Sequence, residues 1–137
     1  MSFSLYGRWY DFRRNLAGIF SAYWHYRPNR WYFFLSLGGQ IFLWFLAYRL
    51  FVLVGGDLFV SHYNVDFGID GVGSSRRAFI APAAAAAVLL LNVVAALSFS
   101  KRAHFHFISH AGGLSSLAAQ ILAALALMSL YLINFLA

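Results

Sequence analysis

Three long apolar runs constrain this chain more than any other feature of its sequence. They cover residues 31–54, 78–100 and 114–136. Because an α-helix rises about 1.5 Å per residue, about 20 apolar residues match the hydrocarbon thickness of a bilayer. The strands of a membrane β-barrel are about ten residues long and alternate apolar with polar side chains, a period that these runs lack. We therefore predict an all-α membrane protein, a single membrane domain with three transmembrane helices.

The small number of charged residues supports this prediction. Of the 137 residues, 62% are hydrophobic and 10% are charged, whereas about a quarter of an ordinary soluble domain is charged. Ten basic and four acidic side chains are too few to cover a core in water, so the lipid bilayer is the first predicted partner. The net charge of +6 is assigned to contact with anionic lipid headgroups rather than with nucleic acid, because the sequence holds no soluble basic domain.

The distribution of lysine and arginine predicts the topology, because basic loop residues stay on the cytoplasmic side. Loop 55–77 contributes Arg76 and Arg77, and loop 101–113 contributes Lys101 and Arg102. Five further arginines precede the first run: Arg8, Arg13, Arg14, Arg27 and Arg30. The N-terminus is therefore expected in the cytoplasm, with loop 55–77 and the C-terminus on the other side.

The first run is too long for a cleavable signal peptide. A mitochondrial presequence is the alternative interpretation, although such peptides are usually richer in serine.

Segment 3–27 shows the periodicity of an amphipathic helix. Its apolar residues recur at steps of three and four and so share one helical face: Leu5, Trp9, Phe12, Leu16, Ile19, Phe20 and Tyr23. The opposite face holds Arg8, Asp11, Asn15 and Gly18. We predict an interfacial helix that lies in the cytoplasmic headgroup region and is ended by Pro28. In a second interpretation, the apolar face packs on a partner membrane protein.

Three amide side chains fall inside the predicted spans: Gln40, Asn92 and Gln120. Without water, each needs a partner from a neighbouring helix, and we expect an interhelical hydrogen-bond cluster that fixes the bundle. The alternative is a polar translocation path, as in an oligomeric transporter or channel component. A path for ions normally contains an ionisable group at mid-depth, and no aspartate lies there.

Arg49 is the one charged residue within a predicted span. It lies about a turn and a half from the outer end of that span, so its long side chain can reach the interface. The first prediction is an interfacial anchor. In the alternative, Arg49 pairs with an aspartate of loop 55–77 and ties this loop to the bundle; the candidates are Asp57, Asp66 and Asp70.

Histidines gather in the stretch HFHFISH, residues 104–110. His106 and His110 have the i, i+4 spacing with which two side chains can share one metal ion on a helix. The chain has no cysteine and no glutamate, and no aspartate lies nearby to complete such a site. Axial haem ligation would need histidines deeper in the membrane. We therefore predict no metal and no cofactor, and expect a polar rim interleaved with Phe105 and Phe107 at the interface.

Loop 55–77 is rich in glycine, serine and other residues that form turns. Asn64, Asp66 and Asp70 carry the oxygen ligands that calcium prefers, but they lack the middle acid and the terminal glutamate of an EF-hand. We predict an ordered extracytoplasmic loop of tight turns, sealed by hydrogen bonds from side chains to the backbone, rather than a regular element.

The stretch DLFVSHYNVDFGIDGVGSSRRAFIAPAA, residues 57–84, resembles a motif in an uncharacterised family of small bacterial membrane proteins, also found at the front of the Sdp-type toxin-immunity proteins. The matching positions are His62, Asn64, Gly68, Asp70, Ser74 and Pro82. Leu58 and Val60 stand where the family has prolines, and the glycine falls one residue later than in the family pattern. The resemblance implies a bacterial inner membrane and, from the immunity proteins, protection against a secreted toxin and signalling in response to it.

These observations favour a protein that acts by binding rather than by catalysis, either an accessory subunit or an immunity-like or sensor-like protein. Its expected partner is another membrane protein or a second copy of the chain. The candidate binding residues lie in the extracytoplasmic loop: His62, Asn64, Asp66, Gly68 and Asp70. A histidine and an aspartate so close in a turn more often bond structurally than act as acid and base, so no catalytic residue is predicted. The alternative function is an oligomeric transporter or channel component.

Overall fold

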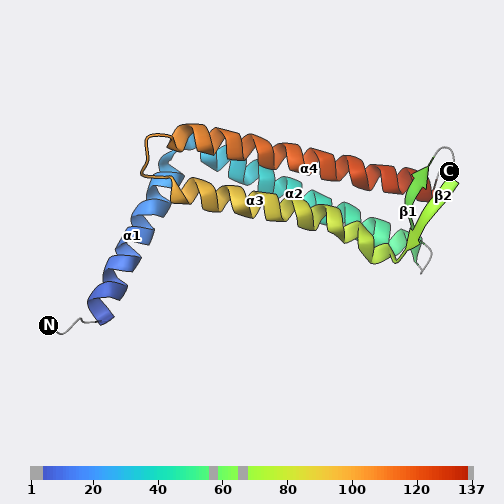
Figure 1. The fold of residues 1–137 in the computed structure, drawn as a ribbon, viewed down its shortest axis with the longest axis horizontal. Coiled ribbons are helices and arrows are strands. Elements are labelled where there is room, and N and C mark those ends of the chain that lie inside the picture. The colour runs from blue at the N-terminus through green and yellow to red at the C-terminus, as the bar shows by residue number, and fades with distance from the viewer. Residues whose placement is uncertain (1–4, 56–58, 65–67, 136–137) are drawn as a thin grey trace.

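Four α-helices, one β-hairpin and one 3-10 helix make up the part of the chain that the structure describes. The computed structural model describes residues 5–55, 59–64 and 68–135. Three of its helical segments are long and apolar enough to cross a membrane, which confirms the predicted all-α architecture with three spans. In chain order the elements are α1 (Leu5–His25), α2 (Arg27–Val54), β1 (Phe59–Asn64), β2 (Gly68–Gly73), a 3-10 helix (Ser75–Phe79), α3 (Ile80–Ser98) and α4 (Phe105–Phe135) (Figure 1).

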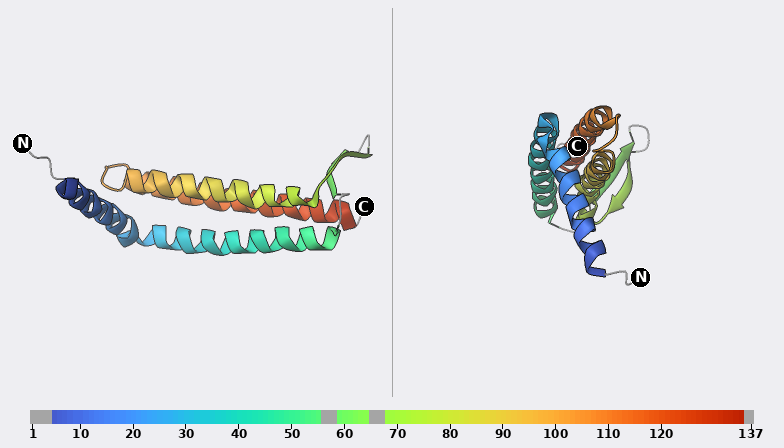
Figure 2. Two further views of the ribbon diagram at one scale, coloured as in Figure 1. Left: turned by 90° about the horizontal axis from the view of Figure 1, so that it is seen from below. Right: turned by 90° about the vertical axis from the view of Figure 1, so that its left-hand side faces the viewer.

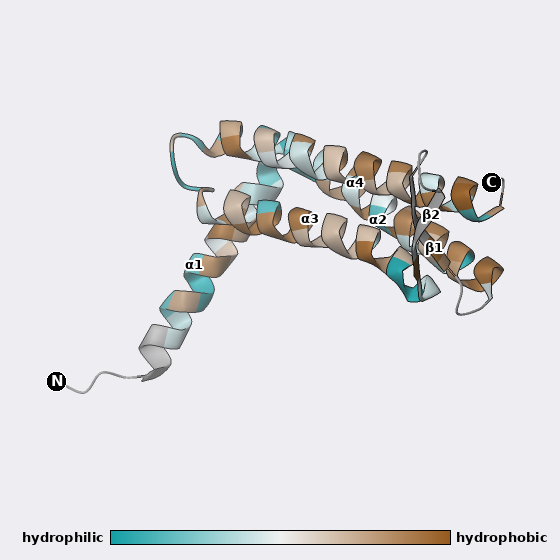
Figure 3. Cartoon of the chain, turned by 45° about the vertical axis from the view of Figure 1, so that its right-hand side comes forward, coloured by the Kyte–Doolittle hydropathy of each residue, from teal (hydrophilic) through white to brown (hydrophobic). Residues whose placement is uncertain are grey.

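Helices α2, α3 and α4 form a bundle in which α4 packs against both of the others. These three run side by side, whereas α1 leaves one end of the bundle obliquely (Figures 1 and 2). Hydropathy follows the same division, because α2 to α4 are apolar along most of their length and α1 mixes polar with apolar residues (Figure 3). The end with α1 is termed the basic end, because it gathers Arg27, Arg30, Lys101 and Arg102. The opposite end is termed the hairpin end.

A sharp elbow separates α1 from α2. Tyr26 has an extended backbone (φ −77°, ψ 105°) and precedes the first turn of α2, which contains Pro28. Proline is well tolerated there, because the first N–H groups of a helix have no intrahelical partner. Asn29 Nδ2 donates to Tyr23 O across the elbow at 3.1 Å. Pro28 therefore belongs to the start of the first span, which begins at Arg27 rather than at residue 31.

Helix α4 begins at Phe105 and not at residue 114 as predicted, so the connection from α3 is short. The prediction assigned Gly112 and Gly113 to a loop. In the structure both continue the helix, and each meets a side chain of another helix, Asn92 at Gly112 and Tyr32 at Gly113. Close packing thus holds in a helix two residues whose local preference favours a turn.

Loop 55–77 contains a β-hairpin, so the prediction that it lacks a regular element is wrong. Strands β1 and β2 pair antiparallel, with Asn64 opposite Gly68. The register shifts on both sides of His62, an irregularity of the kind that bends and twists a strand. Asp70 and Gly71, a dipeptide that is common in tight turns, lie inside β2.

Asn134 fixes the hairpin to the bundle by pairing with β1 as a neighbouring strand would. Its Oδ1 accepts from Val60 N at 3.0 Å and its Nδ2 donates to Val60 O at 3.0 Å. The same Nδ2 donates to Leu130 O within α4 at 2.8 Å. The adjacent Phe59 is 0% exposed and belongs to the apolar core of the bundle. The hairpin is therefore a packed part of the fold.

Asn134→Leu should release the hairpin while α4 stays helical. The substitution removes both bonds to Val60. The backbone N–H and C=O of Val60 then lose their Asn134 partner, at a cost of about 1–3 kcal/mol in stability. Hydrogen–deuterium exchange of the full chain in lipid nanodiscs should then be faster at the amides of β1. Ser129→Ala is the control, because Ser129 Oγ donates within α4, to Leu125 O. Unchanged exchange in Asn134→Leu would contradict the docking role.

Candidate functional site

The buried polar side chains of α2 and α4 gather in the half of the bundle next to the basic end. They recur at steps of seven and four residues on each helix, so each set shares one helical face. These residues, together with Asn92 of α3, are termed the polar core: Asn29, Ser36 and Gln40 on α2, and Ser109, Ser116 and Gln120 on α4. Toward the hairpin end the same faces continue with apolar side chains, which are Leu43, Ala47 and Leu50 on α2, and Ala123 and Leu127 on α4.

Asn92 joins α3 to α4. Its Nδ2 donates to Ser115 Oγ at 2.8 Å and to Ser116 Oγ at 2.9 Å. Both hydroxyls in turn donate to Gly112 O, at 3.1 and 2.9 Å. The serines thus accept from α3 while they donate within their own helix. This network satisfies the Asn92 amide nitrogen in a place where lipid offers no alternative partner.

Gln120 joins α4 to α2. Its Nε2 donates to Ser36 O at 2.8 Å, and its amide lies directly against Gly39 of α2. Asn92 and Gln120 thus both bond to a neighbouring helix, but through separate partners, so the three predicted amides do not form one cluster. Gln40 is buried, and both polar atoms of its side chain have no hydrogen-bond partner among the described residues.

The position of these amides bears on the translocation path that the sequence left open. Gln40 and Gln120 are buried within the bundle of a single chain. They therefore do not lie on a surface where several copies could build a shared pore. Within one chain, the apolar side chains of the hairpin half, such as Leu43 and Leu127, occupy the continuation of the polar core.

Two tyrosines hold a histidine at the basic end of the polar core. Tyr26 OH lies 2.8 Å from His110 Nε2, and Tyr32 OH lies 3.0 Å from His110 Nδ1. A ring nitrogen donates when it carries a proton and accepts when it does not, so the direction of each bond depends on the tautomer of His110. His106 packs on Tyr26 with ring centroids 4.5 Å apart. His106 and His110, whose spacing could suit two metal ligands, each contact a tyrosine. The described residues contain no group of three metal-ligating side chains.

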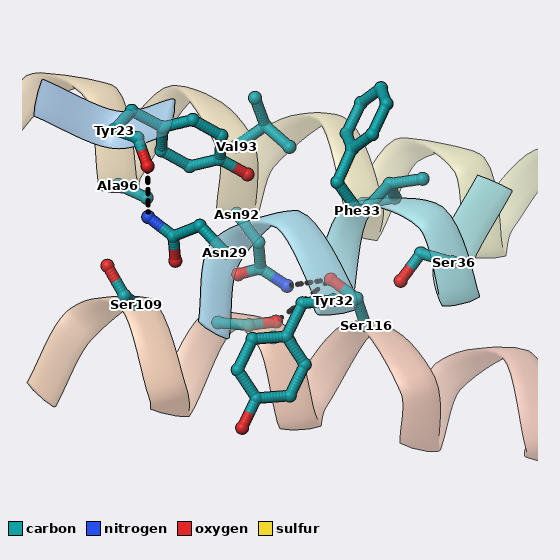
Figure 4. Close-up of a pocket in the computed structure, with 13 residues that line it drawn as sticks. Tyr23, Asn29, Tyr32, Phe33, Ser36, Asn92, Val93, Ala96, Ser109 and Ser116 are labelled. Carbon is teal, nitrogen blue, oxygen red and sulfur yellow. Dashed lines mark hydrogen bonds between the residues drawn. The ribbon is translucent and has the colours of Figure 1, made fainter. Parts of the chain in front are cut away.

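A cavity of about 20 Å³ lies within the polar core. All four helices line it, and Tyr23, Asn29, Ser36, Asn92 and Ser109 bring polar side chains to it (Figure 4). Burial raises the pKa of the Tyr23 phenol above its ordinary value of 10.0. The hydroxyl of Tyr23 therefore stays neutral near pH 7 and remains able to donate a hydrogen bond.

Sequence reasoning missed Asn29, Tyr32, Ser36 and Ser109 as members of this site. Single serines and tyrosines are common in transmembrane helices, so none of them stands out alone. The signal in the sequence was that polar residues recur at steps of seven and then four residues on two different spans. Two helices with such matched faces are expected to pack these faces together, because lipid cannot satisfy the polar groups.

The predicted binding residues of loop 55–77 are distributed over the hairpin. His62 and Asn64 lie in β1, and Gly68 and Asp70 lie in β2. The structure describes the backbone at these four positions, and strand pairing places His62 opposite Gly71 and Asn64 opposite Gly68. Asp66 lies outside the described residues.

Arg49 lies on the exposed side of α2 toward the hairpin end. This position suits the predicted interfacial anchor, because the long side chain can extend toward the headgroups. Of its candidate ion-pair partners, Asp57 and Asp66 lie outside the described residues, and at Asp70 the structure describes the backbone. The ion pair therefore stays a prediction.

No family model, curated protein or solved structure matches this chain. The resemblance of residues 57–84 to the immunity proteins therefore stays a hypothesis. The structure has three features that could support a function. They are a buried polar core, an amphipathic helix at one end of the bundle and a docked hairpin at the other.

Gly113→Ala should destabilise the bundle, whereas Gly38→Ala should not. A Cβ at position 113 would lie 2.7 Å from Tyr32 Cδ1, so the ring would have to move away from its bond with His110, while a Cβ at position 38 meets nothing within 4 Å. Both glycines are interior helix positions, where alanine is otherwise favoured by about 1 kcal/mol. Unfolding by SDS in bicelles should give a loss of about 1–3 kcal/mol for Gly113→Ala. An equal response of the two variants would refute the close contact.

Proposed function

We propose that this chain is a small integral protein of the bacterial inner membrane that acts by binding, as an accessory subunit of a membrane-protein complex. In this proposal the basic end faces the cytoplasm, because arginine and lysine gather there and basic residues stay on that side. The hairpin then lies on the extracytoplasmic side, and α1 lies along the cytoplasmic surface of the membrane.

The exposed apolar side chains of α1 carry this proposal. Trp9, Phe12 and Phe20 are 59%, 52% and 59% exposed, although large apolar surfaces in contact with water are rare. Helix α1 extends away from the bundle, so most of its length has no other helix beside it (Figure 2). The lipid interface and the surface of a neighbouring membrane protein are the two environments that would cover these side chains. An accessory subunit uses both, since it is held at the membrane and against its complex.

The docked hairpin favours a second candidate, a sensor-like or immunity-like protein. Asn134 and the buried Phe59 hold β1 in one place relative to the spans. A fixed strand pair on the extracytoplasmic side suits recognition of an extracytoplasmic partner, because little ordering entropy is lost on binding. The resemblance to the immunity proteins supports the same candidate. The proposed contact residues are those predicted from the sequence, His62, Asn64, Asp66, Gly68 and Asp70.

Spin labels on α1 should report a helix that lies at the membrane surface. The chain has no cysteine, so Leu16→Cys and Asp11→Cys each provide a unique attachment site on opposite faces of α1. In bilayers, the label at position 16 should collide mainly with oxygen, which concentrates in lipid, and the label at position 11 mainly with a water-soluble nickel chelate. Equal access of the chelate to both labels would show that α1 is detached from the surface.

Extraction of the protein from its native membrane in polymer nanodiscs, followed by identification of co-migrating proteins, tests the accessory-subunit proposal. A defined complex with a different membrane protein is expected. The double variant Phe12→Ser/Leu16→Ser should lower the yield of this complex, whereas Asp11→Ser, on the opposite face, should not. A chain that migrates alone or with its own copies would count against a subunit and in favour of the sensor.

The sensor candidate predicts a separate effect of substitutions in the hairpin. His62→Ala or Asp70→Ala should then change an extracytoplasmic interaction at an unchanged level of protein in the membrane. If these variants fail to accumulate, the two positions are structural, and the hairpin loses its place as the binding site.

A further inference from the structure

We propose that the polar core is a hydration site, in which water enters from the basic end and binds inside the bundle. Two buried hydroxyls point to this site. Ser36 is 0% exposed and Ser109 is 3% exposed, and the Oγ atoms of both have no hydrogen-bond partner among the described residues. Buried polar atoms in folded proteins are nearly always bonded, either to the protein or to ordered water. Both serines line the cavity of the polar core.

The size and the lining of the cavity fit water. Its volume of about 20 Å³ exceeds the roughly 10–15 Å³ that one water molecule needs, and a bound water needs two to four polar partners. Ser109 and Ser36 lie toward opposite ends of the row of lining side chains, with Asn92 and Tyr32 between them (Figure 4). A water beside Ser109 therefore has a free hydroxyl and the neighbouring amide of Asn29 within the same cavity (Figure 4).

The chemistry of the lining favours a neutral occupant over an ion. The described residues around the cavity carry hydroxyls and amides and no charged side chain. A cation in the low-dielectric interior would need carboxylates or a full shell of oxygens to replace its hydration. A drug-sized or metabolite-sized molecule is excluded by volume, because such ligands occupy pockets of about 300 Å³ or more.

Access is expected from the basic end alone. On that side the exposed side chain of His110, held by Tyr26 and Tyr32, lies close to the cavity. On the other side the helices are closed by an apolar core that includes Leu43 and Leu127. Gln40, whose buried amide also has no partner among the described residues, lies at the border between the two halves. The bundle is therefore hydrated in one half and dry in the other.

Water-edited solid-state NMR of the full chain in bilayers tests this site, with water itself as the probe. Magnetisation from water should reach Ser36 and Ser109 as fast as it reaches exposed residues of α1. Transfer to Ala47 and Ala123, which are also buried but lie in the apolar half, should be slow and serves as the internal control. If Ser36 and Ser109 receive magnetisation as slowly as the two alanines, the polar core is dry and the proposal fails.

Removal of one hydroxyl gives an independent readout. Ser36→Ala should cause loss of water transfer to the side chain of Asn92, with the backbone spectrum of the bundle retained. Ser129→Ala is the matched control, because this serine is exposed and bonded within α4. Water transfer to Asn92 that is unchanged in Ser36→Ala would show that this hydroxyl does not hold the water and would overturn the assignment.

Discussion

The close approach of α2 and α4 is the constraint on which the rest of the structure depends. Lipid removes the hydrophobic drive between spans, so helices associate through close packing and through hydrogen bonds between them. Gly39 gives room to the amide of Gln120, and Gly113 gives room to the ring of Tyr32. Wider separation would break the bond from Gln120 to Ser36 O and expose the polar core to lipid, where each unpaired group costs several kcal/mol.

The two halves of the bundle have different roles, one in packing the hairpin and the other in orienting the helices. The apolar half, with Leu43, Ala47 and Leu127, supplies a dense core against which Phe59 anchors the hairpin. The polar half supplies bonds that orient the helices, and it leaves a small cavity. A core of this kind specifies one arrangement of the helices, because a rotation of either helix would leave amides and hydroxyls without partners. The fixed hairpin at one end and the projecting α1 at the other depend on that single arrangement.

Features that depend on local composition could be predicted from the sequence, whereas features that depend on contacts between distant residues could not. The three spans follow from apolar length, a property of each segment alone. The start of α4 was predicted too late, because Gly112 and Gly113 favour a turn until Asn92 and Tyr32 pack against them. The hairpin was missed because its glycines favour turns, and its pairing with Asn134 joins residues 74 positions apart. Such a contact leaves no local pattern in the sequence.

The elbow between α1 and α2 connects the proposed binding surface to the proposed hydration site. Asn29 Nδ2 donates to Tyr23 O at the end of α1, and the side chains of both residues line the cavity. Tyr26, between the two helices, bonds to His110 at the same end of the bundle. A partner that pulls α1 away would break the bond from Asn29 to Tyr23 and remove the part of the cavity wall that Tyr23 forms. If a partner moves α1, its binding and the proposed hydration of the polar core would be coupled, because Tyr23 would no longer line the cavity.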